Sequence, residues 1–163
     1  MTRVPPDELE DGILLRPAAP ADAAACHALD HRCFPPDIAY DLSVFDQLCG
    51  RADIMLVAQM NKKIIGMVAA EIDAEQKIGL IVTLDVDPSR QRRRLGTRLM
   101  REVEKKMQMR GVRAVFLHVD ARRFVVHGFY QKLGYKRVGQ LPAYYGKGKD
   151  AFLMSKPLEH IGA

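Results

Sequence analysis

Three closely spaced apolar segments constrain the fold of this chain more than any other feature of its sequence. They are Ile54–Met60, Lys63–Ile72 and Lys77–Val86, which together are rich in valine, isoleucine and methionine. Only Asn61-Lys62 separates the first two segments, and so short a link is typical of a β-hairpin. The segments therefore predict an antiparallel meander of three strands.

The spacing of the apolar residues changes after Asp87-Pro88. From Leu95 to Met107 an apolar residue recurs at every fourth position, and Gly111 follows the last of them. Residues four apart lie on one face of a helix, and glycine is a common helix terminator. This spacing therefore predicts an α-helix that ends at the glycine.

Shorter signals of the same kind predict the other elements. They are a strand at Gly12–Arg16, helices at Ala23–Cys33 and Leu42–Cys49, a strand at Ala114–Val119, a helix at Phe124–Leu133, and a hairpin of Tyr135–Tyr144 with Ala151–Lys156. Asp22 and Asp41 are expected to cap the first two helices. The order β-α-α-β-β-β-α-β-α-β-β predicts a mixed α/β fold with one β-α-β crossover. We expect residues 1–11 to be a flexible lead-in and residues 12–158 to form a single domain.

Composition narrows the class of protein. No apolar run reaches the roughly 20 residues that a membrane-spanning helix needs. The first twelve residues also lack the apolar core of a signal peptide, so we expect a cytoplasmic protein that does not bind membranes. Cys26, Cys33 and Cys49 show no metal-ligand spacing, and we interpret them as buried thiols with no metal site.

Positive charge is concentrated in one stretch. The formal net charge is +5, and five of the nine residues from Arg90 to Arg98 are arginine. They lie where a predicted strand runs into the start of a predicted helix, whose unpaired N–H groups and macrodipole attract anions. Gly96 allows close approach to the backbone. The stretch indicates a site for a phosphorylated cofactor, and the alternative is a solvated basic helix start.

The segment Gln91–Thr97 resembles the pyrophosphate loop of the GNAT superfamily of N-acetyltransferases, written Q/R-x-x-G-x-G/A. Gln91 falls on its first position and Gly96 on its last glycine. Arg94 stands where the first glycine is usual.

A second segment at the right distance strengthens this resemblance. Phe116–Tyr135 is similar to the superfamily pattern L-x-V-x-x-x-N-x-x-A-x-x-x-Y-x-x-x-G-F, with Tyr130 on the tyrosine and Arg123 on the usual asparagine. Residues 142–145 and 150–154 resemble the N-terminal protein acetyltransferases, including the group that acts on a ribosomal-protein alanine. The resemblance covers about residues 12 to 158.

The resemblance implies the GNAT fold and acetyl-CoA as cosubstrate, without a metal. The residues that it assigns to the cofactor are Leu84, Asp85, Val86, Gln91, Arg92, Arg93, Arg94, Leu95, Gly96, Thr97, Arg123 and Tyr130. The backbone N–H of Val86 is expected to polarise the acetyl carbonyl. Tyr130 is expected to protonate the leaving sulfur, because a phenol stays protonated at neutral pH. The alternative is a core tyrosine.

His118 and two aromatic segments complete the predicted site. In some superfamily members the strand position of His118 carries a base, and an imidazole suits that role near neutral pH. The alternative is a histidine bonded to a backbone carbonyl. The acceptor is expected to bind at Phe34, Pro35, Tyr40, Tyr144 and Tyr145, whose rings can line a peptide groove. Simple packing remains the alternative for Phe34 and Tyr40.

Several functions remain compatible with these residues. The leading prediction is an acetyl-CoA-dependent N-acetyltransferase that acts in a ternary complex, preferably on a protein or peptide N-terminus. A small-molecule amine or a lysine side chain is the alternative acceptor, and a non-catalytic acyl-CoA-binding module is the alternative from another class. A nucleic-acid partner is disfavoured, because no predicted helix carries a basic face interleaved with aromatics. A monomer and a homodimer both remain open.

Overall fold

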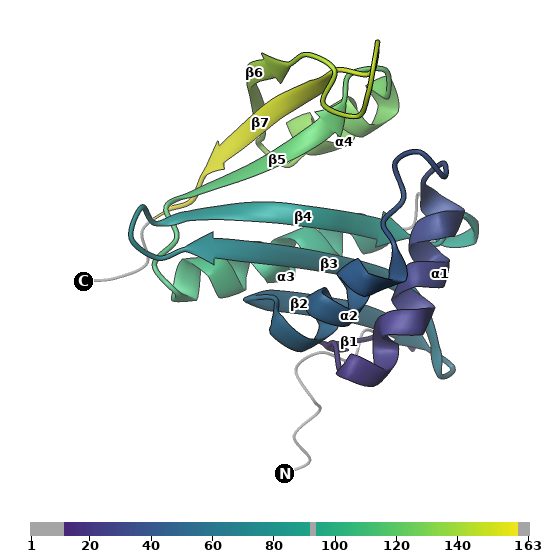
Figure 1. Ribbon diagram of the computed structural model, residues 1–163. Helices are drawn as coiled ribbons and strands as arrows, with labels where there is room; N and C mark the ends of the chain where they lie inside the picture. Colours follow the sequence, from purple (N-terminus) through teal and green to yellow (C-terminus); the bar gives the residue numbers. More distant parts are fainter. Residues whose placement is uncertain (1–11, 92–93, 160–163) are drawn as a thin grey trace. The chain divides into compact units, whose positions relative to one another are not determined.

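The computed structural model describes residues 12–91 and 94–159, and in these residues it contains seven strands and four α-helices (Figure 1). The elements are β1 Leu14–Pro17, α1 Ala23–Cys33, α2 Leu42–Arg51, β2 Ile54–Met60, β3 Lys63–Asp73, β4 Ile78–Val86, α3 Leu95–Met109, β5 Ala114–Asp120, α4 Phe124–Lys132, β6 Lys136–Leu141 and β7 Ala151–Pro157. Two short 3₁₀ turns, Pro20–Asp22 and Pro88–Arg90, precede α1 and follow β4. The predicted order of strands and helices is confirmed. The predicted lead-in, residues 1–11, lies outside the described residues.

The strands form one mixed sheet in the order β1-β2-β3-β4-β5-β7-β6. The pairs β1–β2, β2–β3, β5–β7 and β6–β7 are antiparallel. The pair β4–β5 is parallel, from Ile78 opposite Ala114 to Leu80 opposite Phe116. Helix α3 therefore connects two parallel strands, which is the predicted β-α-β crossover.

The chain divides into two compact units, which we describe separately. The first contains the residues up to Ala70 together with Thr83–Val103, and the second contains Glu71–Val82 together with the residues from Glu104 onward. A single domain over residues 12–158 stays a prediction.

In the first unit, helices cover both faces of the meander. Helices α1 and α2 lie on one face of β2 and β3, and α3 lies on the other (Figure 1). Consecutive residues are therefore buried along Ile54–Ala58 and Ile64–Ala70. Strands that are covered on both faces contain continuous apolar runs without alternation. This explains why these segments are the most prominent apolar stretches of the sequence.

The second unit combines the β5–β7–β6 strands with α4. Val115, Leu117 and Val119 of β5 are buried, in alternation with half-buried residues. The hydroxyl of Tyr135 donates to Glu104 at 2.9 Å, and Lys156 donates to the same carboxylate at 2.6 Å. Burial of the carboxylate is compensated by these two charge-assisted bonds.

The structure differs from the sequence expectations at three local features. Asp41 directly precedes α2, but its side chain makes no capping bond, because the N–H of Val44 donates instead to the backbone carbonyl of Asp41 at 3.0 Å. Asp22 does not cap α1, because its carboxylate instead accepts bonds from Arg16 and from the N–H of Ala19. Strand β6 ends at Leu141, short of the predicted Tyr144, because Ala143 adopts a positive φ of 54° and the chain turns. Among the helices of the described residues, none has both the length and the apolarity to cross a membrane.

Gly66 gives a test of how tightly α3 packs on the sheet. A Cβ at this position would lie 3.1 Å from Cδ1 of Leu99 and 3.2 Å from Cδ2 of Leu95, both buried. We expect Gly66→Ala to lower the free energy of unfolding by about 1–2 kcal/mol, because the core has to shift. Gly50→Ala in α2 is the control, since its Cβ meets nothing within 4 Å, and it should stabilise by about 0.5–1 kcal/mol. Urea denaturation of both variants measures the difference, and an equal effect of the two would contradict the packing.

Candidate active site

In the first unit, the candidate site begins where β4 ends. The carbonyl of Val86 accepts a bond from Sγ of Cys33 and one from Nε2 of Gln91, both at 3.2 Å. Burial raises the pKa of the Cys33 thiol to about 12, so the thiol keeps its proton and can donate. A side chain from α1 and one from the predicted cofactor loop thus hold the same peptide group.

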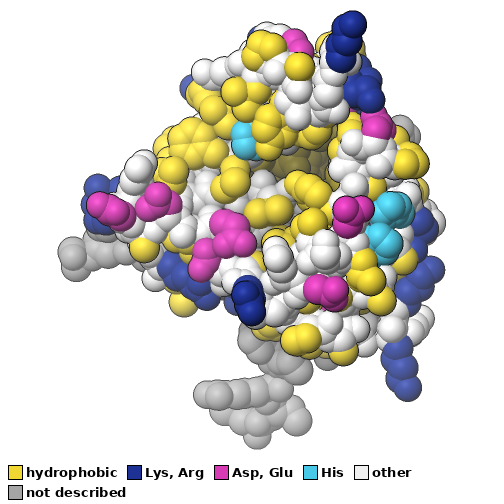
Figure 2. Space-filling model, viewed as in Figure 1, with side chains coloured by type: hydrophobic (Ala, Val, Ile, Leu, Met, Phe, Trp, Pro, Cys, Tyr) yellow, Lys and Arg dark blue, Asp and Glu magenta, His cyan; other side chains and the backbone are white. Residues whose placement is uncertain are grey.

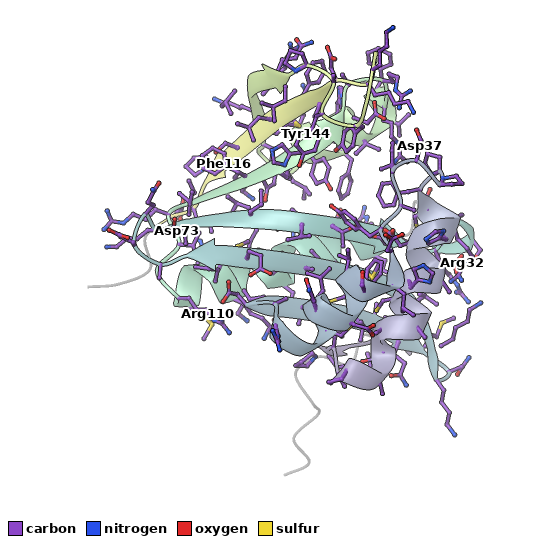
Figure 3. The ribbon with its side chains drawn as sticks, in the orientation of Figure 1. Arg32, Asp37, Asp73, Arg110, Phe116 and Tyr144 are labelled. Carbon is purple, nitrogen blue, oxygen red and sulfur yellow. The ribbon has the colours of Figure 1, made fainter. Side chains whose placement is uncertain are left out.

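Asp87 fixes the turn that follows. Its N–H donates to the carbonyl of Ile65 at 2.8 Å. Its Oδ1 accepts from the N–H and the hydroxyl of Ser89 at 3.0 and 2.7 Å, while Oδ2 pairs with Arg32 of α1 (labelled in Figure 3) at 3.2 Å. The bonds from Ser89 hold the pKa of this carboxyl below its usual range. Asp87 was not among the predicted site residues, although an aspartate before Pro-Ser is a turn signal.

Helix α3 starts directly after a strained residue. Arg94 has a φ of 63°, in the left-handed region, and its carbonyl accepts the N–H of Arg98. Leu95, Gly96 and Thr97 form the first turn of a helix of fifteen residues, where N–H groups have no carbonyl partner within the helix. The conformation of Arg94 explains why glycine is usual at this position of the resembled loop.

The structure brings many of the predicted cofactor residues into one unit. Leu84, Asp85 and Val86 lie on β4, and Gln91, Arg94, Leu95, Gly96 and Thr97 follow within eleven residues. Arg92 and Arg93 lie outside the described residues. Arg123 and Tyr130 belong to the second unit, where Arg123 directly precedes α4. The cofactor role of each residue stays a prediction.

Tyr130 is a buried residue of α4. Its ring packs edge-on against Tyr135 at 5.7 Å and Phe129 at 5.1 Å between ring centroids. Burial raises the pKa of Tyr135, whose hydroxyl is bonded to Glu104. Tyr130 therefore has the packing role that the sequence left as an alternative, and its role as a catalytic acid stays a prediction.

His118 lies on β5 and stacks on a residue of the β6–β7 turn. Its ring is parallel to that of Tyr144 to within 16°, with 4.7 Å between the centroids. Figure 2 shows hydrophobic side chains gathered over β5 and β7, and Figure 3 shows Tyr144 beside β5. Burial lowers the pKa of His118 below its ordinary value of 6.5, so the ring stays neutral at lower pH than a free imidazole.

The predicted acceptor residues lie in two groups. Phe34, Pro35 and Tyr40 belong to the first unit, where both backbone groups of Tyr40 are tied to α1: its N–H donates to Asp30 at 2.7 Å, and its carbonyl lies 3.1 Å from Nε2 of His31. The ring of Tyr40 packs edge-on against Phe45, as the packing alternative expected. Tyr144 and Tyr145 belong to the second unit, with rings edge-on at 4.9 Å. The expectation that both groups bind the acceptor stays a prediction.

The cysteines and the histidines of α1 have structural partners. Cys26 and Cys49 are buried free thiols, and Cys33 is half-buried. His27 and His31 lie with ring centroids 4.3 Å apart. Within residues 12–91 and 94–159, no group of three or more histidine, cysteine or acidic side chains could hold a metal ion.

Comparison with known proteins identifies a family. The model of the acetyltransferase (GNAT) family matches residues 23–135. An N-alpha-acetyltransferase of Sulfurisphaera tokodaii is 29% identical over 113 residues, which cover 63% of this chain and 68% of that protein. The chain spans between 40 and 68% of the length of the curated relatives that it matches.

Two solved structures show the same fold. The ribosomal-protein-S18-alanine N-acetyltransferase of Escherichia coli has a TM-score of 0.82 at 20% identity, covering 92% of this chain and 96% of that one. NAA60 of Arabidopsis thaliana, solved with acetyl-CoA, has a TM-score of 0.80 at 23% identity, covering 90% and 98%. The family predicted from the sequence motifs is confirmed.

Arg94 gives a test of the backbone before α3. Arg94→Gly and Arg94→Ala both remove the guanidinium group, but only glycine adopts the observed φ without a Cβ penalty. We expect the glycine variant to be about 1 kcal/mol more stable than the alanine variant, since the left-handed conformation costs an L-residue roughly 1–2 kcal/mol. Thermal and urea unfolding measure the difference. Equal stability of the two variants would show that Arg94 is not strained.

Proposed function

The chain belongs to the acetyltransferase (GNAT) family, and from this premise we propose that it transfers the acetyl group of acetyl-CoA to a primary amine, preferably the N-terminus of a protein or peptide. The observation that carries the proposal is the junction of β4 and α3. There a fixed strand end leads into the positive end of a long helix, beside arginine side chains. The N-alpha-acetyltransferase relative and the ribosomal-protein-S18-alanine N-acetyltransferase of the same fold support the choice of acceptor, and the NAA60 complex of that fold supports acetyl-CoA as the donor.

The residues of the first unit fit a diphosphate-bearing cosubstrate. The leading amides of α3 and the guanidinium group of Arg94 supply hydrogen bonds and positive charge for phosphate oxygens. Gly96 leaves the backbone of the first turn open to a ligand. The Val86 N–H is the proposed donor to the acetyl carbonyl, where negative charge develops.

The second unit supplies the groups that move protons. Acetyl-CoA supplies an acyl thioester when bound. His118 takes one proton from the acceptor ammonium, so that the nitrogen can form its bond to the carbonyl carbon. Tyr130 donates a proton to the sulfur as the carbon–sulfur bond breaks, and the second proton that the nitrogen loses restores the phenol. The products are an N-acetylated amine and a free thiol. The lowered pKa of His118 keeps the base neutral at physiological pH.

A peptide panel tests the proposed acceptor. Peptides that differ in their first two residues are incubated with acetyl-CoA, while thiol release and the acetylated product are followed by absorbance and mass spectrometry. We expect turnover with free N-termini and none with the same peptides blocked at the N-terminus. Blocked peptides that contain lysine, and a set of small amines, serve as comparisons. Turnover restricted to those comparisons would refute N-terminal specificity, and acetyl-CoA binding without turnover would indicate a non-catalytic module.

Tyr130→Phe tests the proposed acid. The variant keeps the ring that packs on Tyr135 and removes only the hydroxyl, so we expect kcat to fall by about 100-fold with little change in KM. Tyr135→Phe is the matched control in the same cluster. It removes the bond to Glu104 and should lower stability by about 1–2 kcal/mol without a comparable loss of kcat. Steady-state kinetics and urea unfolding of both variants measure these effects, and an unchanged kcat for Tyr130→Phe, with chemistry rate-limiting, would remove the assignment.

A further inference from the structure

The stacked pair of His118 and Tyr144 is a contact that the resemblance does not predict. The two residues are separated by more than twenty positions in the sequence, yet their rings lie face to face at 4.7 Å. Tyr144 belongs to the turn between β6 and β7, and half of its surface is exposed. A half-exposed aromatic ring therefore covers one face of the candidate base.

The turn that carries Tyr144 has its own fixed structure. The carboxylate of Asp150 accepts the N–H of Ala143 at 2.9 Å and the side-chain amide of Gln140 at 2.8 Å. A backbone bond also spans the turn, from the N–H of Tyr145 to the carbonyl of Lys149 at 3.0 Å. The residue before Tyr144 is thus fixed by a side chain at the far end of the turn.

We propose that Tyr144 is a positioning residue for His118, which fixes the plane of the imidazole and keeps water from one of its faces, and that Asp150 holds the turn in which Tyr144 does this. The proposal rests on the proposed function for the statement that His118 acts as the base. The stacking of the two rings is a property of the protein without ligand and does not depend on that function.

Burial of His118, and not a charged neighbour, lowers the pKa of its imidazole. Its neighbour across the strand pair is Leu153 of β7, and Phe116 lies opposite Ser155. Asp120, two residues along β5, is a carboxylate on the same face, but it is bonded to Arg122 through both oxygens at 3.0 and 2.6 Å. Removal of the Tyr144 ring should therefore act through solvent access to the imidazole.

The direct test is NMR titration of the His118 imidazole in the whole 163-residue chain without ligand. In the parent protein we expect its carbon-bound protons to be shifted upfield by the ring current of Tyr144. In Tyr144→Ala this shift should be lost, and the pKa should rise toward 6.5 as water reaches the ring. Tyr144→Phe should keep both properties, because it keeps the ring. His118→Gln assigns the signal.

A second variant tests the role of the turn without changing either ring. Asp150→Ala should move the His118 titration in the same direction as Tyr144→Ala, and the double variant should show little further change, since both act through one contact. Lys147→Ala, in the same turn and exposed, is the matched control and should leave the titration as it is. Parent-like imidazole signals in both Tyr144→Ala and Asp150→Ala would overturn the proposal.

The catalytic part of the proposal has its own readout. In the pH profile of kcat/KM, Tyr144→Ala should move the acidic limb to higher pH together with the pKa of His118, whereas Tyr144→Phe should leave the position of that limb unchanged. A moved NMR titration with an unmoved acidic limb would overturn the positioning role in catalysis. In that case N-terminal acetylation by the parent protein would still stand, so failure of this proposal and failure of the proposed function are distinguishable.

Discussion

The bonds of Asp87 hold the end of a buried strand in place, and the candidate cofactor site of the first unit depends on them. The backbone of Asp87 is bonded to β3, one carboxylate oxygen to Ser89, and the other to Arg32 of α1. A helix terminus can bind an anion only if its orientation is fixed before the anion arrives, because ordering a loop costs conformational entropy. A single buried aspartate ties three elements together here and removes that freedom.

One residue earlier, the carbonyl of Val86 is likewise bonded by side chains from two parts of the first unit. Cys33 and Gln91 bind it from α1 and from the loop. In an extended strand, the N–H and the carbonyl of one residue point to the same edge. The two donors that fix the carbonyl therefore also fix the direction of the Val86 N–H, which is the proposed donor to the acetyl group. The orientation of this proposed amide donor is in this way set by side chains that need not touch the substrate.

The sequence predicted those parts of the molecule that repeat with a period or carry a motif. The buried meander, the helix from Leu95 and the position of Tyr130 on a helix all belong to this class. The turn after Asp87 and the helix start at Leu95 also carry local signals, so both could be anticipated as well. These features depend on residues that are close together in the chain.

The parts that the sequence did not predict depend on a competing side chain, on partners distant in the chain or on a backbone conformation unusual for the residue. Asp22 accepts from Arg16 and does not cap α1, because a nearby guanidinium competes with the helix amides for the same carboxylate. The residue type of Arg94 does not indicate its left-handed conformation, since arginine has no preference for it; only the glycine usual at this position of the resembled loop does. Two contacts form only once the intervening chain has folded. They are the bond of Asp30 to the backbone of Tyr40 and the stack of His118 on Tyr144.

The ion pair of Glu104 and Lys156 illustrates why such distant partners matter for the candidate residues of the second unit. Burying a carboxylate is unfavourable unless charged or polar donors surround it, and Lys156 together with the hydroxyl of Tyr135 provides them. The bond to Glu104 also orients the ring of Tyr135, and that ring packs edge-on against Tyr130. An apolar core of the same volume would bury as much surface but would supply no directional bond to the ring of Tyr135. Since a proton donor acts only from within hydrogen-bond reach of its target, a polar cluster that restrains the Tyr130 ring is better suited to the proposed acid than a purely apolar support.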